Sequence, residues 1–105
     1  HGAILFAENL IFFTPGYPLE DVYDPTGAGD AFAGGFMGYI ARASSVSADD
    51  LRRAMVYGSA LGSFAVERMG VERLLHLGPA EVHQRVSSFR DLTAFDHVPM
   101  LAADA

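Results

Sequence analysis

The stretch D-P-T-G-A-G-D-A-F-A-G-G-F occupies positions Asp24–Phe36 of the 105-residue chain. A proline and two glycines stand between two carboxylates, and the sequence then becomes apolar. Apolar residues recur at helical spacing from Gly27 to about Ala43, so a helix is predicted there. The stretch therefore predicts a glycine turn that leads directly into a buried helix, with Asp30 in its first turn.

The start of this helix has the features of an anion-binding site. A helix N-terminus carries a partial positive charge and several N–H groups that lack an intrahelical partner. Gly27 and Gly29 have no side chain to block access, so their N–H groups and that of Ala28 can point at a phosphate. Asp30 would repel bound phosphate, but it could accept a proton from an attacking hydroxyl. The pattern suits phosphoryl transfer to an alcohol.

The same pattern is also ordinary capping chemistry, since glycine turns and aspartates often begin helices. Two other phosphate motifs are excluded. G-x-x-x-x-G-K-[ST] needs a lysine, and the seven basic residues are all arginine. G-x-G-x-x-G would need a glycine where Phe32 stands. Backbone dipoles must therefore meet the phosphate charge, together with a metal or residues outside this chain.

A β-hairpin is predicted before the motif. Two short apolar runs, Ala3–Ala7 and Leu10–Thr14, are separated by Glu8 and Asn9, and asparagine tolerates the left-handed conformation of a tight turn. Pro15–Pro18 predicts a turn or extended segment. Leu19–Tyr23 alternates weakly and predicts a short strand that leads to the motif.

A second helix is predicted after the motif, over about Ala48–Met69. Ser47 and Asp50 resemble a capping box at its start, and Gly70 is a plausible stop at its end. A stripe of small residues on its apolar face would let another backbone or a flat ligand come close. The apolar face comprises Leu51, Met55, Gly58, Leu61 or Gly62, and Ala65.

A third helix is predicted to start at Gly78-Pro79, because proline suits the first helical position. Its apolar stripe is Val82, Val86 and Phe89, and the pattern fades after about Leu92. We therefore expect one domain over residues 1–92 and a tail over residues 93–105.

Composition narrows the possible partners. The net charge is −6 and no basic cluster exists, which argues against nucleic acid and anionic membranes. No apolar run approaches the roughly 18 residues of a membrane span. The four histidines show no metal-ligand spacing, and the chain has no cysteine.

The beginning of the chain, H-G-A-I-L-F-A, lacks the charged region of a signal peptide, and we expect a cytoplasmic protein. A start without methionine that enters a strand directly suggests a piece of a longer protein, a tag scar or a processing product. A sheet cut from a larger fold would leave an exposed edge, so self-association into a dimer or larger homo-oligomer is expected.

Asp24–Phe36 resembles the C-terminal signature of the ribokinase-like (PfkB) carbohydrate kinases, which is about D-T-x-G-A-G-D-x-F. The surroundings are similar too, with a strand pair before it, two helices after it and V-E-R-M-G at Val66–Gly70. The resemblance covers residues 1 to about 92. It implies the C-terminal part of a three-layer α/β/α, Rossmann-like fold, and ATP-dependent phosphorylation of a sugar or nucleoside hydroxyl.

The resemblance also implies roles for individual residues. Asp30 would be the catalytic base. The anion hole for the transferred phosphoryl group would be formed by the N–H groups of Gly27, Ala28 and Gly29. Magnesium would accompany ATP, held largely through phosphates and water.

A monovalent cation such as potassium would be bound by Asp24 and Thr26, with backbone oxygens near Val66 and Gly70. The adenine would lie beside the small-residue stripe at Tyr57, Gly58, Leu61 and Gly62.

Two departures from the family pattern matter. Pro25 replaces the commoner threonine, and its fixed φ should stiffen the turn. Family members are about three times longer, roughly two domains by the length prior. The isolated chain would then hold the base, the anion hole and part of the nucleotide site, and it would be inactive.

Two alternatives stay open from the residues. The chain could be a stand-alone nucleotide- or anion-binding module without catalysis. It could also be an α/β interaction domain in which the glycine turn only caps a helix.

Overall fold

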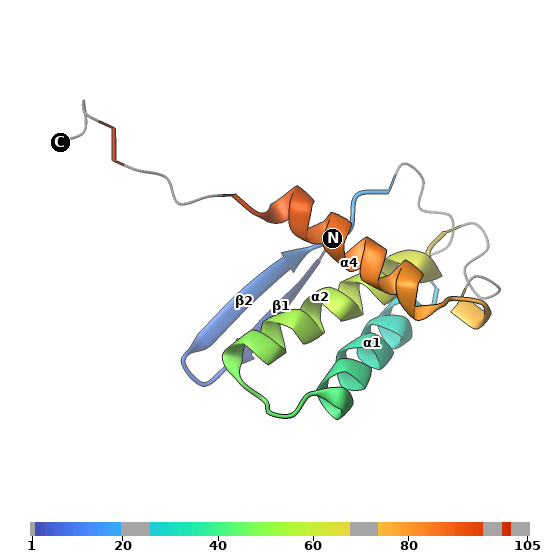
Figure 1. The fold of residues 1–105 in the computed structure, drawn as a ribbon, viewed down its shortest axis with the longest axis horizontal. Coiled ribbons are helices and arrows are strands. Elements are labelled where there is room, and N and C mark those ends of the chain that lie inside the picture. Colours follow the sequence, from blue (N-terminus) through green and yellow to red (C-terminus); the bar gives the residue numbers. More distant parts are fainter. Residues whose placement is uncertain (1, 20–25, 68–73, 96–99, 102–105) are drawn as a thin grey trace.

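A β-hairpin opens the chain (Figure 1). The computed structural model describes residues 2–19, 26–67, 74–95 and 100–101. Strand β1 (Gly2–Ala7) pairs antiparallel with β2 (Leu10–Pro15), and the register places Ala7 opposite Leu10. Asn9 has φ 60°, the left-handed conformation expected of the turn. The predicted hairpin is confirmed, with β2 extending one residue further, to Pro15.

Helix α1 (Ala28–Arg42) follows the glycine turn, with Gly27 as its N-cap. The helix ends at Ala43, whose extended backbone breaks the helical path and whose N–H still donates to the carbonyl of Tyr39 at 3.0 Å. Arg42 in the last turn complements the negative end of the helix dipole. The helix predicted from Gly27 to about Ala43 is confirmed. The prediction that this helix is buried is wrong, because Gly35 is its one buried residue and the other residues of α1 are half-buried or exposed.

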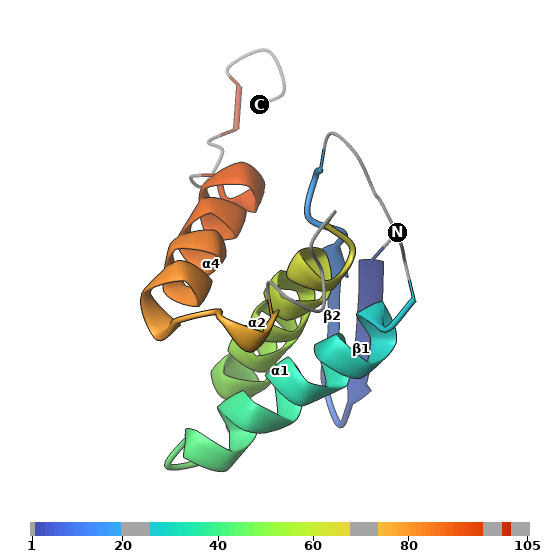
Figure 2. The same cartoon turned by 90° about the vertical axis from the view of Figure 1, so that its right-hand side faces the viewer.

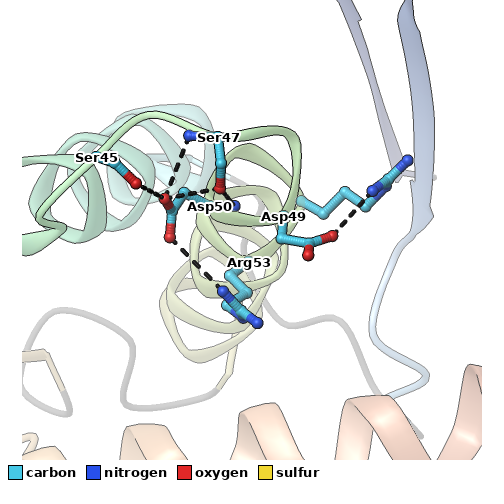
Figure 3. A network of polar contacts seen from close by, with 6 residues as sticks. Ser45, Ser47, Asp49, Asp50 and Arg53 are labelled. Atoms are coloured by element: carbon cyan, nitrogen blue, oxygen red, sulfur yellow. Dashed lines mark hydrogen bonds and ion pairs between the residues drawn. The ribbon is translucent and has the colours of Figure 1, made fainter.

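Helix α2 (Ala48–Ala65) begins with the predicted capping box (Figure 3). The Asp50 N–H donates to the Ser47 hydroxyl at 3.2 Å, and the Ser47 N–H donates to the Asp50 carboxylate at 3.2 Å. The Ser45 hydroxyl also donates to this carboxylate, at 2.8 Å. These hydrogen bonds, that of Ser45 foremost, lower the pKa of Asp50 below its ordinary value of 3.8.

The predicted end of the second helix, Met69, is wrong, because α2 stops at Ala65. The N–H of Glu67 donates to the carbonyl of Phe64 at 3.3 Å, so an i to i−3 bond tightens the chain where the helix ends. Met69 and the predicted stop at Gly70 lie outside the described residues.

Helix α4 (Pro79–Thr93) begins as predicted, with Gly78 as N-cap and proline in the first position. Phe89 is its buried residue, and Val82 and Val86 are half-buried beside it. Ala94, Phe95, Met100 and Leu101 belong to no helix or strand and are exposed. The predicted strand over Leu19–Tyr23 lies outside the described residues except for Leu19, which is in no strand.

Helix α2 is the central element of the molecule, since it contacts α1, α4 and both strands. Figure 2 shows α1 and α2 side by side and antiparallel, with the hairpin behind them and α4 across α2 from α1. The buried core comes mainly from α2, through Ala54, Met55, Ala60, Phe64 and Ala65, joined by Leu10 and Phe89. The fold is thus a small α/β arrangement of a hairpin followed by helices. In the part of the chain described above, no helix is both long and apolar enough to cross a membrane.

Candidate active site

The glycine turn before α1 holds open backbone N–H groups. Gly27 has φ 86° and ψ −6°, a left-handed conformation that glycine adopts without strain. No side chain caps α1, and the helix's own bonding starts when the Ala31 N–H donates to the Gly27 carbonyl at 3.0 Å. The preceding N–H groups, those of Ala28 and Gly29 among them, therefore receive no carbonyl from the helix itself.

The space around these N–H groups is open. A methyl group added at either Gly27 or Gly29 would meet no atom within 4 Å. The partial positive charge of the helix terminus is directed into this space. The turn can therefore accept an anion, because among the described residues no side chain or neighbouring backbone lies within 4 Å of where a Cβ atom of residue 27 or 29 would stand.

The Asp30 carboxylate lies at the third residue of α1 and is exposed. It is not turned into the core between α1 and α2. A carboxylate in this position is next to the open N–H groups and is accessible to a hydroxyl that approaches the same anion. A base must lie within reach of the proton it removes, and the exposed position of Asp30 in the first turn of α1 is compatible with that role.

A cavity of about 650 Å³ lies beside the glycine turn. Its walls come from the base of the hairpin, the segment after β2, the start of α1 and the C-terminal half of α2. The cavity brings together predicted site residues that are far apart in sequence, namely Ala28, Gly29, Gly62 and Val66. Its size falls within the range of about 300–1,000 Å³ that is usual for small-molecule pockets.

Three of the residues predicted to flank adenine lie instead at the contact between α1 and α2. A methyl group at Gly58 would lie 2.9 Å from the carbonyl oxygen of Phe32. The Tyr57 ring packs against the Tyr39 ring at 5.0 Å between centroids. The Leu61 side chain would be 3.1 Å from a methyl group at Gly35. Helix packing thus accounts for the small-residue stripe at these positions, and an adenine contact there stays a prediction.

Of the residues predicted to bind a monovalent cation, Asp24 and Gly70 lie outside the described residues. Thr26 is exposed and directly precedes the glycine turn. Val66 forms the C-cap of α2 and lines the same cavity as Ala28 and Gly29. Among the described residues, no group of three or more His, Cys, Asp or Glu side chains could hold a metal ion.

Three hydroxyl-bearing residues of the cavity wall were not predicted from the sequence, namely Tyr17, Ser59 and Ser63. Ser59 and Ser63 are four residues apart on α2, so they share the helix face on which Gly62 also lies. The signal available in the sequence was the spacing of these two serines on a helix face that is otherwise apolar. The structure shows that both serines are buried.

Open glycine N–H groups and an adjacent exposed carboxylate define a candidate phosphoryl-transfer site on an α/β fold. Residues 1–76 match the model of the pfkB family of carbohydrate kinases. The chain belongs to this family, because the match covers well over half of its 105 residues. A search of curated proteins finds no match. Helix α4 begins at Pro79, after the matched segment.

Proposed function

We propose that this chain provides the base and the phosphate-binding turn of an ATP-dependent kinase that phosphorylates a sugar or nucleoside hydroxyl. The observation that carries the proposal is the exposed Asp30 carboxylate beside the open N–H groups of Ala28 and Gly29. Bound ATP supplies the γ-phosphoryl group and ADP as the leaving group. Because the reaction depends on ATP, we place it in the cytoplasm.

In the proposed reaction, Asp30 accepts the proton of the acceptor hydroxyl. The hydroxyl oxygen forms a bond to the γ-phosphorus while the bond from that phosphorus to the bridging oxygen of ADP breaks. The N–H groups of Gly27, Ala28 and Gly29 donate to the phosphoryl oxygens, on which negative charge develops. Preorganised donors of this kind are typically worth about 10²–10³ in rate each.

The cavity supports a nucleotide at this place. Gly62 lines it, so the adenine would be bound toward Gly62, whereas Tyr57, Gly58 and Leu61 lie at the contact between α1 and α2. Magnesium would be held largely through phosphate and water. For potassium, the proposed ligands are Asp24, Thr26 and backbone oxygens near Val66 and Gly70. The position of Val66 on the cavity wall supports this assignment.

The hairpin supports a further layer of structure. Its Leu10 and Thr14 face is buried and contacts α2. Its other face exposes four large apolar side chains, Ile4, Phe6, Ile11 and Phe13, each more than half exposed. We infer that helices of the complete kinase cover this face in the three-layer α/β/α fold, and that the same missing part completes the acceptor site. The isolated chain is then expected to be inactive.

The direct test is Asp30→Asn in an active kinase that contains this sequence. Loss of a positioned base should lower kcat by more than about 10²-fold. Asp49→Asn is the matched control, because Asp49 is an exposed carboxylate near the N-terminus of α2 that pairs with Arg52 at 3.0 Å. Turnover of the Asp30→Asn variant near that of the control would refute the base role.

A stand-alone binding module is the second candidate, because the chain forms both the open turn and the cavity by itself. Calorimetry of the 105-residue chain with ATP and magnesium measures the binding that the module requires. Because the isolated chain is expected to be inactive in both cases, phosphoryl transfer is measured in the complete protein that contains this chain, and binding there without any transfer would favour the module.

A further inference from the structure

The side chain of Arg85 reaches from α4 to the C-terminal end of α2. Only 17% of this side chain is exposed. Its guanidinium carbon lies 3.6 Å from the centroid of the Phe64 ring, and Phe64 itself is almost fully buried. A cation over an aromatic face in a desolvated place is a favourable contact that fixes the plane of the guanidinium.

The same guanidinium holds two polar groups at the end of α2. Its Nη1 atom donates to the Ser63 hydroxyl at 3.0 Å and to the Glu67 carboxylate at 2.5 Å. The Ser63 hydroxyl in turn donates to the Ala60 carbonyl at 2.6 Å, so its direction is set from both sides. The last turn of α2 has no basic residue of its own. Arg85 therefore supplies, from another helix, the positive charge that this helix end favours.

Arg85 also contacts a residue of the cavity wall that comes from the segment after β2. Its guanidinium carbon lies 5.0 Å from the centroid of the Tyr17 ring. The Tyr17 hydroxyl is hydrogen-bonded to the Ser88 hydroxyl at 2.8 Å, and its ring packs against Phe89 at 5.6 Å. Tyr17 is thus held by three residues of one face of α4.

These contacts meet at the cavity, although Arg85 does not line it. Tyr17, Ser63 and Val66 do line it, and they come from the segment after β2 and from the end of α2. The Arg85 guanidinium thus contacts residues from both of these wall segments without lining the cavity itself. A lysine could not reproduce this arrangement, because it lacks the planar group that stacks on rings while donating in the same plane.

We propose that Arg85 is a positioning residue for the nucleotide-side cavity, and that α4, which lies outside the family-matched segment, sets the spacing between its two walls. The proposal rests on the proposed function for the identity of the ligand. Arg85 acts through Ser63 and Tyr17 and touches neither nucleotide nor acceptor.

The test compares Arg85→Ala and Arg85→Lys with the control Arg90→Ala in the full 105-residue chain. Arg90 lies on the same helix and is exposed. Calorimetric titration with Mg·ATP gives the first readout, and hydrogen exchange at the N–H groups of residues 63–67 gives the second. Both Arg85 variants should weaken Mg·ATP about tenfold, the lower end of the effect of supporting residues in metal sites. Exchange at residues 63–67 should rise while exchange within α1 stays at the wild-type rate, and Arg90→Ala should change neither.

The outcomes are distinguishable. Wild-type affinity in Arg85→Ala would overturn the positioning role and leave the proposed function standing. Equal acceleration of exchange in α1 and α2 would also overturn it, because that result means general destabilisation. Full rescue by Arg85→Lys would show that charge alone suffices and would overturn the role of the planar group. Absence of Mg·ATP binding by the wild-type chain would overturn the nucleotide as the ligand of this cavity, and with it the role of Arg85, whereas the base role of Asp30 is tested separately by Asp30→Asn.

Discussion

Gly35 of α1 and Gly58 of α2 face each other where the two helices cross. A methyl group at Gly35 would lie 2.8 Å from the Tyr57 carbonyl oxygen and 3.0 Å from the Cα of Gly58. A methyl group at Gly58 would lie 2.9 Å from the Phe32 carbonyl oxygen. These close neighbours are backbone atoms, which cannot move aside as the end of a flexible side chain can. The contact therefore sets how closely α1 packs against α2.

Gly35→Ala should therefore destabilise the fold. Overpacking of a tight contact typically costs about 1–3 kcal/mol, and the backbone neighbours place this variant toward the upper end. Gly34→Ala and Gly38→Ala are matched controls on the same helix, since a methyl group at either position meets nothing within 4 Å. Both controls should raise the free energy of unfolding by about 0.5–1 kcal/mol. Urea unfolding followed by circular dichroism measures the free energy of unfolding of all three variants. Equal stability of Gly35→Ala and Gly34→Ala would contradict the close helix contact at Gly35.

Gly29→Ala separates binding from stability. The methyl group has room within the protein, because nothing lies within 4 Å of it, but it would enter the space assigned to the anion. The free energy of unfolding should stay constant or rise by up to about 1 kcal/mol. Affinity for Mg·ATP should fall, as calorimetry would show. An unchanged affinity would mean that the phosphate does not approach this N–H group.

Gly27→Ala provides the contrasting variant in the same turn. Its position is equally open, but its φ of 86° is strained for any residue with a Cβ atom. Alanine should cost about 1–2 kcal/mol of stability there. A Gly27→Ala chain as stable as Gly29→Ala would show that the turn relaxes into a different conformation.

Local signals in the sequence were sufficient to predict the hairpin, the helices α1, α2 and α4, and the capping box at Ser47. Each depends on residues within a few positions of one another, such as Asn9 in its turn or Pro79 at the start of α4. The position of Asp30 next to the glycine turn was predicted in the same way, because the turn and Asp30 both belong to the start of one helix.

Contacts between residues that are far apart in the sequence could not be predicted from such local signals. The small residues of α2 were compatible with either a ligand or a second backbone, and only the packing shows that α1 occupies the place next to Gly58. From the sequence, Arg85 could not be distinguished from any other arginine on a helix with a single apolar stripe. Its partners Tyr17 and Phe64 are many positions away, so no local pattern could join them.

The stability of α2 should fall in acid through Asp50. The pKa of this carboxyl is lowered in the folded state, chiefly by the Ser45 hydroxyl and then by Ser47. A lowered folded-state pKa stabilises the fold above the unfolded value and loses this contribution as the pH falls through the folded value. Asp50→Asn should therefore be less stable than wild type at pH 7, and the difference should shrink below pH 3.8.

Thermal unfolding between pH 7 and pH 2 measures this difference, with Asp49→Asn as control. Asp49 pairs with Arg52 on the exposed surface, where an ion pair contributes little. A difference between wild type and Asp50→Asn that is constant across this range would show that the capping box does not depend on the charge of Asp50.

The exposed face of the hairpin should make the isolated chain self-associate. In the strand register Ile4 is opposite Phe13 and Phe6 is opposite Ile11, so isoleucine and phenylalanine alternate over the patch. A second copy turned by a two-fold axis in the plane of the sheet would place each phenylalanine on an isoleucine. A contiguous apolar patch of this kind favours association in water.

Phe6→Thr should therefore shift the 105-residue chain toward the monomer in sedimentation or light scattering. Its stability should change little, because Phe6 is 73% exposed and threonine is well suited to a strand. Leu92→Ser is the control, an apolar residue 59% exposed on α4, away from the hairpin, and it should leave association unchanged. A monomeric wild-type chain, or equal effects of the two variants, would mean that this face is not a contact between copies. The apolar character of the face would then be explained by a cover that the rest of the kinase supplies.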